Sequence, residues 1–157
     1  MDPILQQLEE NGRLTNAQLA AMNDKTEAEV ACAIEEYEKA GVILGYPALI
    51  DWDKTDKECV QAVIDLKVTP QRDRGFDSVA EAICNFPQVK SVYLTSGAYD
   101  LSVVVEGKTM REIGFFVAQK LSVLDGVTST ATQFIMKKYK DKGVVFTAPE
   151  DERGMCD

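Results

Sequence analysis

The chain has 157 residues, 45% of them hydrophobic, which is enough to build the core of one ordinary domain or of two small ones. No apolar run reaches the roughly 20 residues of a membrane-spanning helix, and Met1-Asp2-Pro3 does not open a signal peptide, so we expect a cytoplasmic protein without membrane contact. The formal net charge of −9 has the wrong sign for a protein whose main task is to hold phosphates, because nonspecific nucleic-acid affinity comes largely from Lys and Arg.

The first third of the chain shows apolar residues at helical spacing. A first short helix contains Leu5 and Leu8 and is expected to end near Asn11-Gly12, where glycine can take the left-handed conformation of a helix end. The run Thr15–Gln18 is a capping box, in which the threonine oxygen accepts an otherwise unpaired backbone N–H and the glutamine reaches back. This capping box predicts a second helix that runs to about Met22.

A second capping box, Thr26–Glu29, predicts a third helix that ends before Gly41. Its inward-facing stripe is Val30, Ala33, Ile34 and Tyr37. Two helices joined by so short a turn, preceded by another helix and followed by the extended run Val42–Tyr46, are typical of a helix-turn-helix with a small wing. We therefore expect residues 1–53 to form a winged helix-turn-helix unit, with the polar stretch 51–58 as the hinge to the second half.

Residues 54–140 show alternating strands separated by two helical segments. In chain order, the pattern predicts a strand at Val60–Val68, a helix through Phe76–Ile83, strands at Val89–Leu94 and Leu101–Val105, a helix through Thr109–Leu121 and a strand from Val127 to about Lys138. The order β-α-β-β-α-β is that of the ferredoxin-like fold, in which both helices cover one face of a four-stranded antiparallel sheet. The predicted fold class is therefore α+β, and residues 141–157 form a C-terminal tail whose acidic end, 150–157, shows no periodicity.

The face of the sheet away from the helices is expected to carry Val63, Val104, Phe134 and Met136. So much apolar surface is rarely left in water on a small monomer, which favours a two-fold dimer in which two such sheets pack together. The alternative is a monomer whose own tail covers this face.

Cysteine and histidine usage limits the chemistry of the chain, which has four cysteines and no histidine. Cys32, Cys59, Cys84 and Cys156 are widely scattered without a C-x-x-C pair, so we expect reduced thiols that mostly pack in the interior, and no metal site. The missing histidine removes the usual acid–base group, although Glu, Asp, Lys or Tyr can act in a tuned site. The composition disfavours an enzyme without excluding one, and it indicates neither catalytic residues nor a cofactor.

The chain resembles the Lrp/AsnC family of transcriptional regulators over nearly its whole length. The family's recognition-helix pattern, a serine-like cap followed by V-x-x-R-I-x-x-L-E-x-x-G-x-I, is similar to Thr26 and the run Val30–Ile43. Its sensing domain, called RAM, resembles Val92–Asp100, which contains a G-x-x-D turn between two strands of the predicted sheet. The resemblance implies an amino-acid effector near that turn between subunits, sheet-to-sheet homodimers that often build octamers, and promoter DNA as a partner.

The effector site implied by this resemblance agrees with the chemistry of the residues around the turn. A free amino acid needs an acceptor for its ammonium group, donors for its carboxylate and an apolar wall for its side chain. Asp100 supplies an acceptor and Gly97 exposes backbone N–H groups. The remaining candidates are the hydroxyls of Thr95, Ser96, Thr130 and Thr132 and the apolar side chains of Leu94 and Tyr99. The alternative is an ordinary hairpin turn in which Asp100 binds local backbone.

The DNA-reading half departs from the family pattern, because Ala33 stands where the recognition helix usually has arginine. The residues expected to face DNA are Lys25, Thr26, Ala28, Ala31, Cys32 and Lys39, and the small ones cannot make bidentate bonds to bases. The glutamates of the same helix are Glu27, Glu29, Glu35, Glu36 and Glu38. They are either helix-favouring solvated residues or the mark of a real loss of DNA affinity.

Three functions fit these observations. The first is a regulator that binds promoter DNA as an oligomer, with affinity gathered from several weak domains, and responds to an amino acid or a related effector. The second is an effector-sensing oligomeric binding protein with weakened or lost DNA binding. The third is an enzyme subunit similar to sirohaem decarboxylases, which share this layout. Their proposed chemistry relies on histidine and arginine near a tetrapyrrole, and this chain has no histidine.

Overall fold

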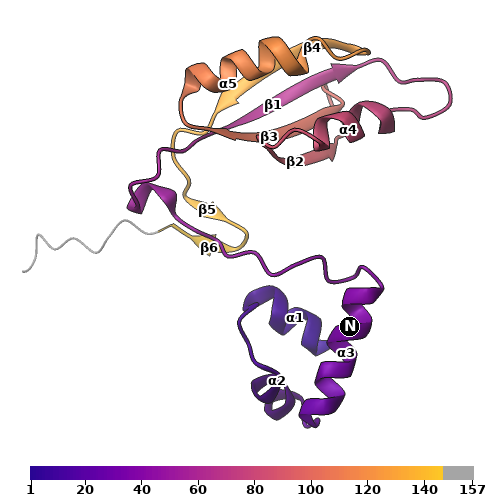
Figure 1. The fold of residues 1–157 in the computed structure, drawn as a ribbon, viewed down its shortest axis with the longest axis vertical. Helices are drawn as coiled ribbons and strands as arrows, with labels where there is room; N and C mark the ends of the chain where they lie inside the picture. Colours follow the sequence, from indigo (N-terminus) through magenta and orange to yellow (C-terminus); the bar gives the residue numbers. More distant parts are fainter. Residues whose placement is uncertain (147–157) are drawn as a thin grey trace, which may run out of the picture. The chain divides into compact units, whose positions relative to one another are not determined.

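The computed structural model describes residues 1–146 and divides after Ile50 into two compact units (Figure 1). The division falls three residues before the boundary expected from the sequence. The acidic segment 150–157 and Cys156 lie outside the described residues. Within residues 1–146, no helix has the length and apolar character needed to cross a membrane.

The first unit contains three helices, α1 (Pro3–Glu10), α2 (Asn16–Asn23) and α3 (Glu27–Lys39). Both predicted capping boxes are confirmed. The Thr15 Oγ1 atom accepts the Gln18 N–H at 3.1 Å and the Gln18 Oε1 atom accepts the Thr15 N–H at 2.9 Å. Thr26 and Glu29 form the same reciprocal pair at 3.1 and 2.9 Å. These local bonds satisfy backbone donors that have no partner within the helix, and they fix where α2 and α3 begin.

The core of the first unit is small and lies between the three helices. Its buried members are Ile4, Leu8, Leu19, Ala20 and Val30, with Leu14, Ala33, Ile34 and Ile43 packed against them. The inward-facing stripe predicted for α3 is therefore confirmed for Val30, Ala33 and Ile34, and Tyr37 is partly buried with its hydroxyl donating to the Asp2 carboxylate.

Two predictions for this unit are wrong. The first helix does not end on a left-handed glycine, because Asn11 caps it in an extended conformation and Gly12 has no positive φ. Residues 42–50 form no wing strand; the N–H groups of Val42 and Ile43 instead bond to the Tyr37 carbonyl at 2.9 and 3.2 Å. A strand requires a hydrogen-bonded partner, and no other segment among the described residues pairs with this one.

The second unit confirms the α+β ferredoxin-like prediction. Its main elements are β1 (Val60–Val68), α4 (Asp77–Cys84), β2 (Val89–Leu94), β3 (Leu101–Gly107), α5 (Met110–Phe116) and β4 (Val127–Phe134). A short helix η1 (Trp52–Lys54) precedes β1, and α5 continues as a π-helical turn, η2 (Val117–Leu121). The antiparallel sheet has the order β2-β3-β1-β4. The last strand ends at Phe134, not near Lys138, and is followed by an unexpected hairpin, β5 (Lys140–Asp141) and β6 (Val144–Val145).

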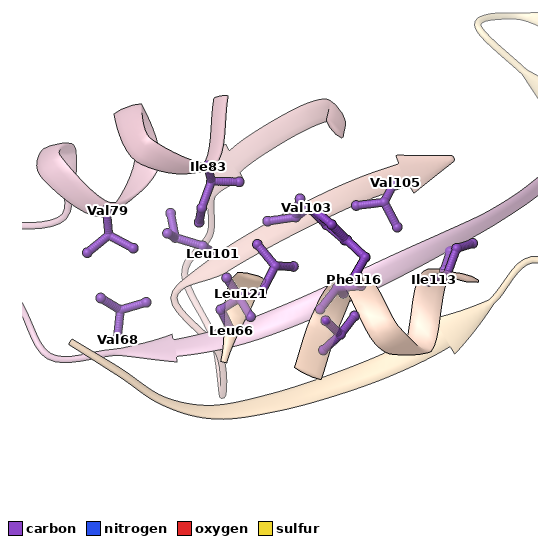
Figure 2. Packing of buried hydrophobic residues seen from close by; sticks show 13 residues of the cluster. Leu66, Val68, Val79, Ile83, Leu101, Val103, Val105, Ile113, Phe116 and Leu121 are labelled. Atoms are coloured by element: carbon purple, nitrogen blue, oxygen red, sulfur yellow. The ribbon is translucent and has the colours of Figure 1, made fainter. Parts of the chain in front are cut away.

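The core of this unit lies between the sheet and its helices (Figure 2). Alternation along β1 places Ala62, Ile64, Leu66 and Val68 on the buried face, and β3 contributes Leu101, Val103 and Val105. The helices supply Val79, Ile83, Ile113, Phe116, Val117 and Leu121. Figure 2 shows Val79 and Ile83 of α4 pointing toward Val68 and Leu101. This packing fixes the strand registers that position the turn between β2 and β3.

The open face of the sheet differs from its prediction. Val63 lies opposite Val104 on this face, as expected. Phe134 lies opposite Ala62 and packs on the buried side, because paired residues of an antiparallel sheet point to the same face, and Met136 lies beyond the end of β4. The other open-face positions of the three strands β1, β3 and β4 are Gln61, Asp65, Lys67, Ser102, Glu106, Ser129, Ala131 and Gln133. The face is therefore much more polar than predicted.

The cysteines also differ from their prediction. Cys32 and Cys84 are exposed and only Cys59 is partly buried, so two of the three described thiols are not packing residues. Residues 1–146 contain no cluster of three or more cysteine or carboxylate side chains that is arranged to hold a metal ion.

Candidate functional site

The turn between β2 and β3 presents a short exposed surface. The Thr95 N–H donates to the Asp100 carbonyl at 2.8 Å, and the Thr95 hydroxyl donates to the Tyr99 carbonyl at 3.1 Å. Residues 95–98 are exposed between these closing bonds, whereas Tyr99 and Asp100 are partly buried. The turn is thus held by its own backbone and leaves the Ser96 hydroxyl and the surface of Gly97 in solvent.

Asp100 connects this turn to the end of β1. Its Oδ2 atom accepts the Val68 N–H at 2.8 Å, and its own N–H donates to the Leu66 carbonyl at 2.9 Å. Asp100 is therefore a backbone acceptor, but its partner lies on β1 and not within the turn, so the bond is not the local one of the hairpin alternative. Only its Oδ1 atom remains a candidate acceptor for a ligand.

Gly97 is not required by the conformation of the turn. Its φ is not positive, and a Cβ atom built on it meets no atom within 4 Å. The missing side chain therefore leaves open surface beside the exposed backbone of the turn. A ligand that binds there can approach backbone N–H groups without displacing protein atoms.

Thr130 and Thr132 lie away from the turn within one chain. They sit on β4 opposite Leu66 and Ile64, at one edge of the sheet, whereas Leu94 and Thr95 belong to the strand and turn at the other edge. Two strands separate these edges, which corresponds to about 14 Å at the usual spacing between strands. The structure therefore brings Leu94, Thr95, Ser96, Gly97, Tyr99 and Asp100 together but not the two threonines, because β4 pairs with β1 and not with β2.

The residues predicted to face DNA lie on α3 and at the two positions before it. Lys25, Thr26, Ala28, Ala31, Cys32 and Lys39 are all exposed. The Lys39 ammonium forms an ion pair with Glu35 at 2.7 Å, and the Cys32 thiol lies 3.8 Å from a Glu36 carboxylate oxygen. Residues 1–50 hold nine Asp and Glu against three Lys and Arg. This unit therefore offers little positive charge for phosphates.

A polar cluster at the start of β1 is absent from the sequence predictions. The Lys57 ammonium lies 2.9 Å from a Glu106 carboxylate oxygen and 4.0 Å from the centroid of the Trp52 ring. Burial alone would raise the pKa of Glu106, but hydrogen bonds from Lys57 and Gln61 outweigh it and hold that pKa below its usual range. The cluster fastens the segment before β1 to the sheet. It depends on the register that places Gln61 opposite Glu106, which no local sequence pattern signals.

Residues 61–145 match the sequence model of a protein family, described as the Lrp/AsnC ligand binding domain. The chain belongs to the Lrp/AsnC family of transcriptional regulators. It is 50% identical over 151 residues to the uncharacterized HTH-type transcriptional regulator YugG of Bacillus subtilis, which covers 96% of this chain and 91% of that protein. Both YugG and the leucine-responsive regulatory protein described below are named as regulators and not as enzymes, which gives the sirohaem-decarboxylase alternative no support.

Two further matches are described with an amino acid, one in its name and one as a bound molecule. The leucine-responsive regulatory protein of Rhizobium meliloti is 26% identical, over 88% of each chain. The transcriptional regulator NMB0573 of Neisseria meningitidis was solved as a complex with L-Met, and its fold matches this chain with a TM-score of 0.72 at 25% identity. That match covers 98% of this chain and 99% of NMB0573, so both units have counterparts there.

Proposed function

We propose that this Lrp/AsnC regulator binds promoter DNA in the cytoplasm as a homo-oligomer and changes its binding in response to an amino acid or a related small effector. One observation carries the proposal: the same chain contains a helix-turn-helix unit and a βαββαβ unit. Both capping boxes of the first unit are formed, and the second unit matches the family's ligand binding domain. The L-Met complex of NMB0573 supports an amino acid as the class of effector.

The effector is proposed to bind at the turn from Thr95 to Asp100. The Asp100 Oδ1 atom accepts from the effector's ammonium group, and the exposed backbone and hydroxyls of the turn donate to its carboxylate. Leu94, which is 65% exposed, and Tyr99 supply apolar surface for the effector's side chain. Thr130 and Thr132 enter such a site only from a second subunit, since they lie at the opposite edge of the sheet.

The proposed assembly is a two-fold homodimer that packs open sheet faces together and builds octamers. Val63 and Val104 lie opposite each other on the two central strands and form the apolar middle of that face. The polar positions around them lower the hydrophobic driving force, so the dimer is expected to use hydrogen bonds and other exposed apolar residues as well. Light scattering that gives a single-subunit mass in dilute solution would contradict this assembly.

A thermal-shift screen of the amino acids tests the effector. A ligand present at 100 times its dissociation constant stabilises the folded protein by about 2.7 kcal/mol, which raises the melting temperature by several degrees. Gly97→Val is expected to abolish the shift and to keep the unliganded melting temperature, because the added side chain meets open space. The matched control is Gly45→Val, also in open space, which retains the shift. The absence of a shift with any amino acid would refute the proposed class of effector.

A second candidate function is an effector-sensing oligomer that no longer binds DNA. It is favoured by one observation, the nine carboxylates against three basic side chains in residues 1–50, with Lys39 already paired to Glu35. Gel-shift titration at low salt separates the two functions. A DNA-binding regulator retards genomic DNA fragments in the gel at micromolar protein concentration. If no fragment is retarded, only the second function remains.

A further inference from the structure

The segment after β4 forms a small hairpin with a basic surface. Strands β5 and β6 pair Lys140 with Val145 and Asp141 with Val144, and the Phe146 N–H donates to the Tyr139 carbonyl at 2.9 Å. At the turn, Lys142 and Gly143 have φ values of 47° and 79°. Two consecutive left-handed residues are what a tight two-residue hairpin of type I′ requires. The segment therefore holds its side chains on a defined scaffold.

Four lysines are concentrated on this hairpin and its approach: Lys137, Lys138, Lys140 and Lys142. Its one carboxylate, Asp141, lies 3.6 Å from the Lys138 ammonium. Within residues 1–146, the other three lysines form no ion pair, although the Lys137 ammonium lies 5.1 Å from the centroid of the Tyr139 ring. Unpaired like charges this close repel one another, and a polyanion would relieve that repulsion.

Tyr139 adds a second kind of contact to this surface. This large aromatic residue is 71% exposed, and its hydroxyl is a hydrogen-bond donor. Lysine, tyrosine and backbone N–H groups are common partners of the phosphate oxygens of DNA. The hairpin thus combines hydrogen-bond donors with an excess of positive charge, which the acidic first unit lacks.

We propose that the β5–β6 hairpin is a DNA-backbone contact of this regulator, in which Lys137, Lys140 and Lys142 bind phosphates of the duplex without reading bases. The inference rests on the proposed function, since it assumes that the protein binds promoter DNA. It assigns the nonspecific part of the affinity to the sensing unit and leaves the exposed face of α3 to read the shape of the groove.

The test compares two triple variants on one promoter fragment, with Kd measured by fluorescence anisotropy between 50 and 200 mM salt. The hairpin variant is Lys137→Gln, Lys140→Gln and Lys142→Asn, since asparagine tolerates the left-handed conformation at 142. The control variant, Lys90→Gln, Lys108→Gln and Lys120→Gln, removes the same charge from three exposed lysines of the same unit.

Each phosphate contact contributes about 0.9 to the slope of log K against log salt, so loss of three contacts lowers the slope by about 2.7 for each subunit that touches the fragment. With one such subunit, the unmodified protein should lose roughly 40-fold more affinity than the hairpin variant over this salt range, and more where several subunits bind. The control variant should follow the unmodified protein. An unchanged slope in the hairpin variant overturns the hairpin contact and leaves the proposed function standing. The hairpin contact is also overturned if the slope changes equally in both variants, or if light scattering shows that the hairpin variant has an altered mass. If the unmodified protein binds no DNA, the hairpin contact and the proposed function are both overturned.

Discussion

Thr15 decides where the helix before the turn begins, because its hydroxyl accepts the Gln18 N–H and its own N–H is bound by the Gln18 side chain. Replacement of such a cap by alanine typically costs about 1 kcal/mol. We expect Thr15→Ala to lower the free energy of unfolding of the first unit by about that amount in urea titration, and Thr15→Ser to preserve it. A Thr15→Ala variant as stable as the unmodified protein would show that the bond makes no net contribution.

Glu106 gives the stability of the second unit a dependence on pH. Its pKa is lowered because hydrogen bonds from Lys57 and Gln61 outweigh the opposite effect of burial. A carboxylate with a lowered folded pKa contributes stability that is complete above its unfolded pKa, about 4.3, and is lost as the pH falls through the folded value.

We therefore expect Glu106→Gln to destabilise the protein by about 1 kcal/mol at pH 7 and by less as the pH falls below about 4. Urea unfolding monitored at pH 7, 5, 4 and 3 measures the difference. Glu58→Gln, at an exposed position, serves as the control and should show no such dependence. A destabilisation by Glu106→Gln that is constant over this pH range would contradict the assigned role of the ion pair.

The role of Asp100 shows where sequence reasoning about the site reached its limit. The G-x-x-D spacing indicated both a ligand acceptor and a backbone acceptor, and the sequence offered no means to decide between them. The bond to the Val68 N–H joins residues 32 positions apart, so it follows from the register of β1 against β3 and from no local pattern.

At the level of elements, local signals predicted more than pairing signals did. The capping boxes and helical stripes placed α2 and α3 correctly, because those bonds lie within four residues of one another. The sheet face predicted for Phe134 was wrong, because the register of the edge strand β4 is set by its neighbour β1. The predicted wing failed for the same reason, since residues 42–50 have no partner strand among the described residues.

Gly126 provides a test of the turn that places β4. Its φ is 92°, and an added Cβ atom would lie 3.3 Å from the Thr69 carbonyl oxygen. The Thr69 N–H donates to the Gly126 carbonyl at 2.8 Å, which holds the two backbones close together. Gly126→Ala is therefore expected to destabilise the second unit by at least about 1 kcal/mol in urea unfolding. Gly45→Ala, in open space and without a positive φ, should stay within roughly 0.5 kcal/mol of the unmodified protein. Equal stability of the two variants would contradict the strain assigned to Gly126.

For the whole molecule, the separation into two units with separate cores agrees with a division of labour between DNA binding and sensing. The net charge of −9 argues against strong binding by any single subunit, and an oligomer raises the effective concentration of several weak contacts. Regulation by an effector then requires a coupling free energy between the two kinds of site, and such a coupling is reciprocal.

The most direct test of this account measures Kd for a promoter fragment with and without the amino acid that raises the melting temperature, and Kd for that amino acid with and without DNA. The account predicts that the amino acid changes the DNA affinity by about 5-fold or more, and that DNA changes the amino-acid affinity by the same factor. A DNA affinity that is identical at saturating effector, or no DNA binding at low salt, would contradict it.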